Sequence, residues 1–269
     1  MTVDKKAVLV VSFGTSYHDA LKSSIESAER DIYEALPDYE PRRAFTSEFI
    51  VHKLAKRDGI LVDSPVEALA RLKDEGFTRV VVQPLHIIPG FEYHEVQNAV
   101  IDCEKSRAFQ SICLGEPLLY NHDDYSMVVK ALEVQLTPNG PGEAVVFMGH
   151  GTNHISNASY YRLQRCLDEA GLNAYIANVE GDPSFEAVRN RLHMSGVQRV
   201  CLMPFMLVAG DHAKNDMAGG DDSWKGVLER EGFRVDVHMH GLGENEAIRR
   251  IYVQKAIKAV NGETAGKGR

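Results

Sequence analysis

The sequence lacks several features that would place it in a common class of protein. Its 269 residues include no long run of lysine or arginine, and the formal net charge is −8. A nucleic acid or an anionic membrane surface would therefore have to bind against the overall electrostatic field. The chain also has no GxxxxGK[ST] phosphate-binding loop, which argues against a reaction driven by ATP. We expect no nucleic-acid partner, no membrane insertion and no ATP.

Cysteine is scarce, and its spacing is irregular. The four cysteines show no CxxC pattern, so there is little sign of a disulfide framework, which suits a reducing compartment. The N-terminal segment MTVDKKAVLVVSFGTS has a short apolar run that ends in a glycine turn without a small-residue cleavage site. It predicts a first strand and not a signal peptide. We expect a cytoplasmic protein; the alternative is an exported, periplasmic protein from which a leader has been removed.

Short apolar strands alternate with amphipathic helical segments. Residues 7–13 (AVLVVSF) predict a strand, and apolar residues spaced by three and four over residues 19–36 predict the following helix. A capping box at residues 64–67 (SPVE) begins another helix, which precedes a strong strand at residues 79–88. Strands separated by helices form βαβ units, and hence parallel sheets with helices on both faces. Further strands are predicted near residues 111–115, 144–149, 174–179, 199–208 and 234–240.

An internal repeat relates two parts of the chain. Residues 8–16 (VLVVSFGTS) align with residues 145–153 (VVFMGHGTN), and residues 80–92 (VVVQPLHIIPGFE) align with residues 200–212 (VCLMPFMLVAGDH). A supersecondary plan repeated in this way indicates two similar α/β domains, each a parallel sheet flanked by helices. The Pro/Gly-rich stretch TPNGPGE at residues 137–143 separates them.

The predicted domains are therefore residues 1–137 and 143–269. The last predicted helix, at about residues 246–260, is assigned to the second domain; the alternative is that it packs on the first domain. In open parallel sheets, ligands bind beyond the carboxyl ends of the strands. We expect the active site in a cleft between the two domains, lined by such strand ends.

Three chemically active side chains follow strands at related places in the repeat. His150 follows the first strand of the second half, where Phe13 stands in the first half, and Glu92 aligns with His212. An interdomain cleft would bring His150, Glu92 and His212 together. Two imidazoles and a carboxylate suit divalent cobalt, iron, nickel or zinc, and they leave coordination positions open.

Seven segments, in order along the chain, carry a resemblance to a known family: SFGTSYHD (12–19), RAFTS (43–47), LHIIPGFEY (85–93), VVFMGHG (145–151), MLVAGDHAKNDM (206–217), DSWK (222–225) and GLGEN (241–245). In these segments the chain resembles the anaerobic, type II (CbiK-like) cobalt chelatases, which act on sirohydrochlorin in cobalamin synthesis. The resemblance runs from residue 7 to about residue 255. It implies the two-domain chelatase fold shared with ferrochelatases, and it matches His150, His212 and Glu92 to the family's metal-binding and catalytic positions.

The resemblance implies an enzyme, a lyase that inserts Co²⁺ into sirohydrochlorin, or into a relative in another oxidation state, without ATP. Metal insertion removes pyrrole N–H protons, and a neutral imidazole, with an ordinary pKa of about 6.5, can bind a metal or accept a proton. His150 is the first candidate for both roles, with His212 and Glu92 holding the ion. Two alternatives stay open: Fe²⁺ insertion into the same ring for sirohaem or haem synthesis, and a carrier that binds tetrapyrrole, haem or metal without turnover.

Sirohydrochlorin is rich in carboxylates, which the protein has to bind locally. The predicted substrate-binding loop leads into a helix, whose N–H groups and positive dipole end favour anions; it comprises Ser12, Phe13, Gly14, Thr15, Ser16 and Tyr17. Arg43 is the best single cation for a bidentate carboxylate clamp.

One residue departs from the pattern that the resemblance leads us to expect. His94 stands two positions after Glu92, where an acidic residue is expected. It is either an exposed helical histidine or a ligand of haem or of a second metal, for which a site at a contact in a homo-oligomer is one option.

Simpler structural roles compete with several of these assignments. Glu92 has the alternative of being a solvated residue of a first helical turn, which the helix dipole stabilises. For His212 and Asp216, at positions i and i+4, the alternative is a simple surface pair. His86 is expected to be a core histidine with satisfied hydrogen bonds. Glu180 either lines the cleft or caps the next helix.

Overall fold

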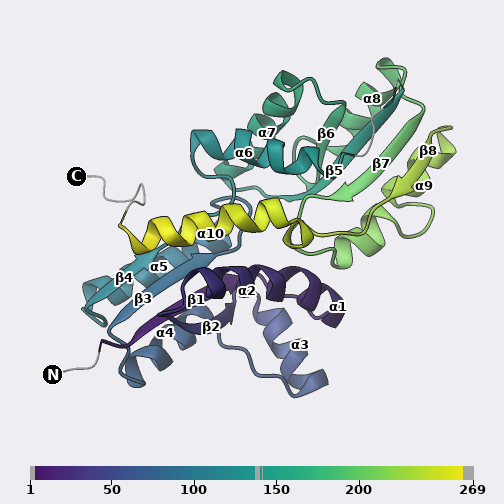
Figure 1. Ribbon diagram of the computed structural model, residues 1–269. Helices are drawn as coiled ribbons and strands as arrows, with labels where there is room; N and C mark the ends of the chain where they lie inside the picture. The colour runs from purple at the N-terminus through teal and green to yellow at the C-terminus, as the bar shows by residue number, and fades with distance from the viewer. Residues whose placement is uncertain (1–3, 137–139, 141, 263–269) are drawn as a thin grey trace. The chain divides into compact units, whose positions relative to one another are not determined.

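The computed structural model describes residues 4–136, 140 and 142–262 (Figure 1). Their contacts divide the chain into two compact units. Of the described residues, the first unit holds 4–120 and 249–262, and the second holds those from Asn121 to Ile248. This division falls earlier than the predicted boundary at residues 137–143, part of which (137–139 and 141) lies outside the described residues. The division also crosses the last helix, whose residues from Arg249 to Val260 are grouped with the first unit.

The first unit is built on a parallel sheet with the strand order β2-β1-β3-β4. Its central strand β1 is buried almost throughout, so only a continuous apolar run satisfies both of its faces. In register, Val11 of β1 lies between Ala44 of β2 and Pro84 of β3. The strands are β1 (Lys6–Ser12), β2 (Glu40–Phe45), β3 (Arg79–Pro84) and β4 (Ser111–Leu114).

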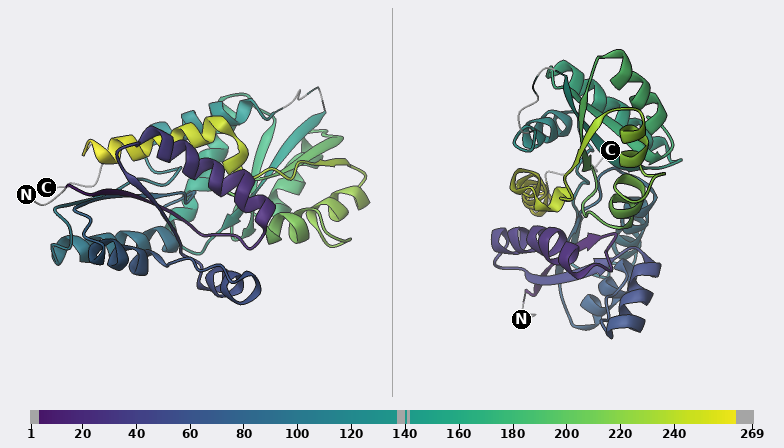
Figure 2. Two further views of the ribbon diagram at one scale, coloured as in Figure 1. Left: turned by 60° about the horizontal axis from the view of Figure 1, so that its bottom comes forward. Right: turned by 90° about the vertical axis from the view of Figure 1, so that its right-hand side faces the viewer.

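Helices cover both faces of this sheet. One face packs against α4 and α5 through a shared apolar core. On the other face α10 lies beside α2 in both views of Figure 2: Arg249 contacts Asp31 of α2 at 2.6 Å, and the Tyr252 hydroxyl donates to the Leu85 carbonyl at 2.9 Å. The helices are α1 (His18–Ala20), the π-helical turn η1 (Leu21–Ile25), α2 (Glu26–Ala35), α3 (Glu48–Asp58), α4 (Pro65–Asp74), α5 (Phe91–Lys105) and α10 (Glu246–Val260).

The sheet of the second unit repeats this plan, with the parallel order β6-β5-β7-β8. Met148 of β5 pairs with Pro204 at the end of β7, just as Val11 pairs with Pro84 at the end of β3. The fold class and the internal repeat expected from the sequence are thus confirmed. The strands are β5 (Glu143–Gly151), β6 (Ala174–Glu180), β7 (Arg199–Pro204) and β8 (Arg234–Val237).

The helices of the second unit also enclose its sheet. One face packs against α8, α9 and the turn η3. The helices α6 and α7 lie side by side in Figure 1. The Tyr160 ring of α7 meets the ring of Phe205, just after β7, edge-on. Among the described residues, no helix is both long enough and apolar enough to cross a membrane. The helices are α6 (His122–Glu133), η2 (Ile155–Asn157), α7 (Ala158–Glu169), α8 (Phe185–Met194), η3 (Ala213–Met217), α9 (Trp224–Arg230) and η4 (Leu242–Glu244).

Candidate functional site

The glycines on both sides of His150 are required by the close approach of β6. A Cβ atom on Gly149 would lie 2.4 Å from the Asn178 Oδ1 atom, and one on Gly151 would lie 1.7 Å from the Glu180 carbonyl oxygen. Gly151 also has a φ of 80°, which L side chains rarely adopt. His150 is therefore the one side chain between two positions that exclude a Cβ, and it is exposed at the carboxyl end of β5.

The structure brings two of the predicted metal ligands together within the second unit. His150 ends β5, and His212 stands eight residues beyond Pro204, the last residue of β7. Their imidazole rings meet edge-on, with centroids 4.8 Å apart and planes at 84°. The strand-end rule therefore places both histidines at one edge of the β6-β5-β7-β8 sheet.

Each of these imidazoles presents its Nε2 lone pair. The His150 Nδ1 atom lies 2.9 Å from the Gly151 carbonyl oxygen, and the His212 Nδ1 atom lies 2.7 Å from Asp216 Oδ2. Carbonyl and carboxylate oxygens only accept hydrogen bonds, so Nδ1 must be the donor in both contacts. In the neutral rings Nε2 is then left to bind a metal or to accept a proton.

His212 is held in place from two directions. It precedes the turn η3, whose residues Ala213 and Met217 are fully buried in the apolar core. The loop before it accepts hydrogen bonds from the GLGEN segment: Leu242 N–H donates to the Met206 carbonyl at 2.8 Å, and Gly243 N–H donates to the Leu207 carbonyl at 2.9 Å. The segment noted in the sequence thus supports the loop that carries His212.

Glu92 belongs to the first unit, in the first turn of α5, which begins after Gly90. Neighbouring carboxylates make this a negatively charged spot: partial burial, followed by the charges of Glu92 and Glu48, raises the pKa of Glu95. In the described part of the chain, no three histidine, cysteine, aspartate or glutamate side chains form a group ready to hold a metal ion. The joining of Glu92 to the histidine pair stays a prediction.

Glu180 is a carboxylate that the sequence left undecided. It is the last residue of β6, it is exposed, and in register it pairs with Gly151 directly after His150. The strand end in NAYIANVE was the available signal, but strand pairing alone decides that β6 lies next to β5. Glu180 is therefore a second candidate carboxylate, within the same unit as the imidazoles.

The predicted anion-binding loop has its hydroxyl groups turned inward. Ser12, Thr15 and Ser16 are 2%, 4% and 3% exposed, and Thr15 Oγ1 accepts a hydrogen bond from the Tyr17 N–H at 3.2 Å. Phe13 is instead 50% exposed. The most accessible part of this loop is thus the apolar side chain of Phe13, and not the serine and threonine hydroxyls.

The predicted carboxylate clamp is already engaged by the protein. The Arg43 guanidinium donates from Nε to Glu29 at 2.7 Å, contacts the second Glu29 oxygen, and lies 3.3 Å from Glu26. Arg57 is a candidate that the sequence did not single out: it donates to the Ser16 carbonyl of the loop at 2.6 Å. It also donates to both carboxylate oxygens of Asp58, at 2.8 and 2.6 Å, and its side chain is 44% exposed. Nothing in its local sequence distinguishes it from other helical arginines.

The two remaining histidines of interest lie in the first unit. His94 is half-buried in α5, its ring centroid 5.9 Å from that of Tyr93, and a role as haem or metal ligand stays a prediction. His86 was expected to have satisfied hydrogen bonds, and this is wrong. Both of its ring nitrogens are buried without a partner among the described residues, and burial lowers its pKa to about 4.

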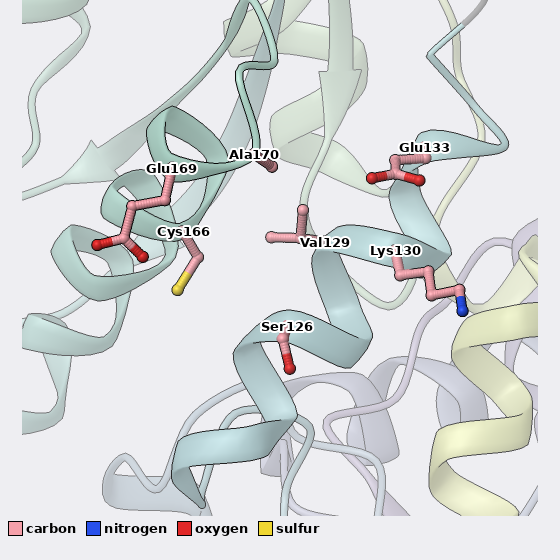
Figure 3. A pocket seen from close by; sticks show the side chains of 7 residues that line it. All are labelled: Ser126, Val129, Lys130, Glu133, Cys166, Glu169 and Ala170. Carbon is pink, nitrogen blue, oxygen red and sulfur yellow. The ribbon is translucent and has the colours of Figure 1, made fainter.

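A surface hollow of about 370 Å³ lies between α6 and α7 (Figure 3). It is lined by side chains of α6 and α7 and by Ala170 just after α7, with Lys130 and Glu133 at one side and Cys166 and Glu169 at the other. None of these residues comes from the carboxyl end of a strand, so the hollow is separate from the histidine pair.

Comparison with known sequences gives concordant results. The model of the family described as cobalt chelatase (CbiK) matches residues 6–261. The chain is 44% identical over 259 residues to the sirohydrochlorin cobaltochelatase of Salmonella typhimurium strain LT2, covering 96% of this chain and 97% of that protein. It is 34% identical over 264 residues to the sirohydrochlorin cobaltochelatase CbiKC of Nitratidesulfovibrio vulgaris strain Hildenborough, covering 97% and 93%.

Comparison with solved structures supports the fold. SirB from Bacillus subtilis with Fe³⁺ superposes with a TM-score of 0.62 at 13% identity, over 96% of this chain and 97% of that one. CbiX, described as the terminal enzyme of sirohaem biosynthesis in denitrifying bacteria, superposes with a TM-score of 0.55 at 16% identity, over 94% and 99%. At such low identity these likenesses establish the chelatase fold alone.

Proposed function

This chain belongs to the CbiK family of cobalt chelatases, and from that premise we propose that it inserts Co²⁺ into sirohydrochlorin without ATP, in anaerobic cobalamin synthesis. The observation that carries the proposal is the pair of imidazoles at 4.8 Å, each with its Nε2 lone pair available. Two neutral nitrogen ligands bind a borderline divalent ion while leaving coordination positions for the nitrogens of the macrocycle.

Metal capture is the first step. His150 and His212 ligate Co²⁺ through Nε2, and a nearby carboxylate offsets part of its charge. Glu180 can supply that carboxylate from the end of β6, next to Gly151, and Glu92 is the candidate from the first unit. A two-nitrogen, one-carboxylate set binds first-row divalent ions in the general order of their affinities, so geometry and supply select cobalt.

Proton removal is the second requirement. The macrocycle gives up its pyrrole protons as the metal enters, and an imidazole that releases the metal regains a basic Nε2 atom. His150 is the candidate base, because it lies exposed at the end of β5. General-base catalysis by a positioned histidine typically contributes 10²–10⁴-fold to the rate.

The substrate is held by the β1–α1 loop. Exposed Phe13 offers an apolar surface to the ring, and the Arg57 guanidinium at the Ser16 carbonyl offers a charge to a substrate carboxylate. Both arginines already pair with a carboxylate, Arg43 with Glu29 and Arg57 with Asp58. Arg57 is the better candidate because its side chain is the more exposed, 44% against 29%. The hydroxyls of Ser12, Thr15 and Ser16 act by shaping the loop, since they are buried.

The decisive experiment mixes the purified protein with sirohydrochlorin and Co²⁺, without nucleotide, and follows the absorbance of the macrocycle. We expect many turnovers per protein, no stimulation by ATP, and a loss of about 10²–10⁴-fold in His150→Ala. Replacing Co²⁺ with Fe²⁺ in the same assay measures the alternative, iron insertion.

The outcomes separate the candidate functions. Faster insertion of Fe²⁺ than of Co²⁺ would favour a ferrochelatase of the same fold. A spectrum that changes only in proportion to the protein added, equally in wild type and in His150→Ala, would identify a carrier and remove the catalytic role of His150.

A haem site at His94 is a separate proposal of lower priority. Titration with haemin should produce a shifted Soret band that His94→Ala abolishes and that His122→Ala, at an exposed helical histidine of the second unit, leaves unchanged. An unchanged Soret band in His94→Ala would show that His94 is an ordinary helical residue.

A further inference from the structure

We propose that Asp216 is a positioning residue that fixes the tautomer and orientation of the His212 ring for metal capture. The inference rests on the proposed function, because it assigns a second side chain to the same site. Its starting point is the 2.7 Å contact between Asp216 Oδ2 and His212 Nδ1.

The turn behind this contact is anchored in the apolar core, although the two side chains reach the surface. His212 and Asp216 are 37% and 46% exposed at the side chain. The turn η3, which follows His212 and contains Asp216, begins at Ala213 and ends at Met217, both fully buried in the apolar core. A π-helical turn of this kind is rare and occurs frequently at functional sites.

A histidine–carboxylate pair by itself proves little, because the second unit contains others. His193 lies 2.9 Å from Glu231, at the ends of α8 and α9, and therefore at the amino-terminal edge of the sheet. What distinguishes His212 is the second imidazole, that of His150, 4.8 Å away at the carboxyl-terminal edge. Among the described residues, His212 is the histidine of such a pair whose ring also meets a second imidazole; the His193 and His240 rings, paired with Glu231 and Glu244, do not.

The need for Asp216 follows from imidazole chemistry. A neutral imidazole carries its proton on either nitrogen, and a ring with Nε2–H has no lone pair there for a metal. The two histidines meet this need by different means: the Gly151 backbone carbonyl holds the His150 proton on Nδ1, and the Asp216 carboxylate does so for His212. Loss of such an outer partner typically costs 10–100-fold in metal affinity.

The first measurement is made on the metal-free protein. Long-range ¹H–¹⁵N spectra of the histidine rings, assigned with His212→Gln, should show His212 with its proton on Nδ1 in the wild type and a mixed or reversed tautomer in Asp216→Asn. Calorimetric titration with CoCl₂ should show a 10–100-fold weaker affinity in Asp216→Asn, and Asp216→Glu should recover most of it, because a longer carboxylate at the same position can still accept from Nδ1.

The matched control is Glu231→Gln, which removes the carboxylate from His193 at the opposite edge of the sheet. It should leave both the His212 spectrum and the Co²⁺ affinity unchanged. In turnover, Asp216→Asn should raise the KM for Co²⁺ by 10–100-fold and leave the KM for sirohydrochlorin unchanged, whereas general loss of structure would alter both.

The possible results separate a failure of this inference from a failure of the proposed function. An unchanged tautomer and Co²⁺ affinity in Asp216→Asn, or an equal loss of affinity in Asp216→Glu, would overturn the inference even if the wild type inserts cobalt. A wild type that binds Co²⁺ through His212 but never inserts it would defeat the proposed function and leave the Asp216 comparison intact.

Discussion

In the first unit, β1 ends at Ser12 and the next residue is Phe13, 50% exposed; in the second, the equivalent place at the end of β5 is held by His150. Both positions are followed by a glycine with positive φ, 93° at Gly14 and 80° at Gly151. The repeated sheet therefore preserves the turn and changes the side chain that the turn presents. One unit offers an apolar ring there and the other an imidazole.

The second point of comparison lies after β3 and β7. In the first unit Glu92 lies in the first turn of α5, a regular helix of 15 residues. In the second unit the aligned residue is His212, which leads into a π-helical turn of five residues. The shorter turn places Asp216 against the His212 ring. The histidine pair that we propose as a metal site is thus built into the second unit, on a sheet plan that both units share.

Substitution of the side chains at the two strand ends should have the largest effect on catalysis. His150→Phe gives the second unit the residue of the first and removes both a metal ligand and the candidate base, so kcat should fall by about 10²–10⁴-fold. Phe13→Ala should mainly raise the KM for the tetrapyrrole, by less than about tenfold, since one apolar contact contributes about 1 kcal/mol. Steady-state kinetics with Co²⁺ measures both; equal losses of kcat would erase the distinction between the units.

The glycines that follow these positions should differ in their tolerance of a side chain. In Gly151→Ala the new Cβ meets the fixed Glu180 backbone oxygen at 1.7 Å, and in Gly14→Ala it meets the Phe45 ring, which can shift, at 2.7 Å. Both substitutions also require a positive φ. We expect losses in the free energy of unfolding of about 4 kcal/mol for Gly151→Ala and about 2 kcal/mol for Gly14→Ala.

Urea denaturation of the two glycine variants tests this order. If Gly14→Ala and Gly151→Ala lost equal free energy of unfolding, the Phe45 ring would be as rigid as the β6 backbone.

His86 and its repeat counterpart Met206 provide the smallest contrast. His86 titrates near pH 6.5 in the unfolded chain but at about 4 in the folded protein, because burial disfavours its charged form. Between these values the unfolded state binds the additional proton, so stability falls as the pH falls. From pH 7.5 to pH 5 the wild type should lose about 2 kcal/mol that His86→Met, which has no titrating group at this position, does not lose.

Urea midpoints at pH 7.5 and pH 5 for the wild type and His86→Met give this difference directly. Equal losses in the two proteins would show that the His86 imidazole is solvated or finds a partner.

Much of the fold was predictable from local pattern. Runs such as AVLVVSF are apolar on both faces, which is the requirement of a central parallel strand, and the repeat of SFGT and GHGT fixed the correspondence of the two sheets. The structure confirms both, down to the shared positive φ at Gly14 and Gly151. The boundary between the units was less accessible, because it depends on contacts of α6 and α10 that the Pro/Gly-rich stretch does not report.

The sequence by itself determined the chemistry available: a histidine between glycines, a second histidine at the aligned strand end, and a surplus of carboxylates. Tertiary structure decided which of these groups act together. Strand order placed Glu180 beside Gly151. The packing of Ala213 and Met217 set Asp216 against His212. Arg43 donates to Glu29 instead of facing solvent. These outcomes depend on contacts between residues far apart in the chain, whose energies no local pattern of residues encodes.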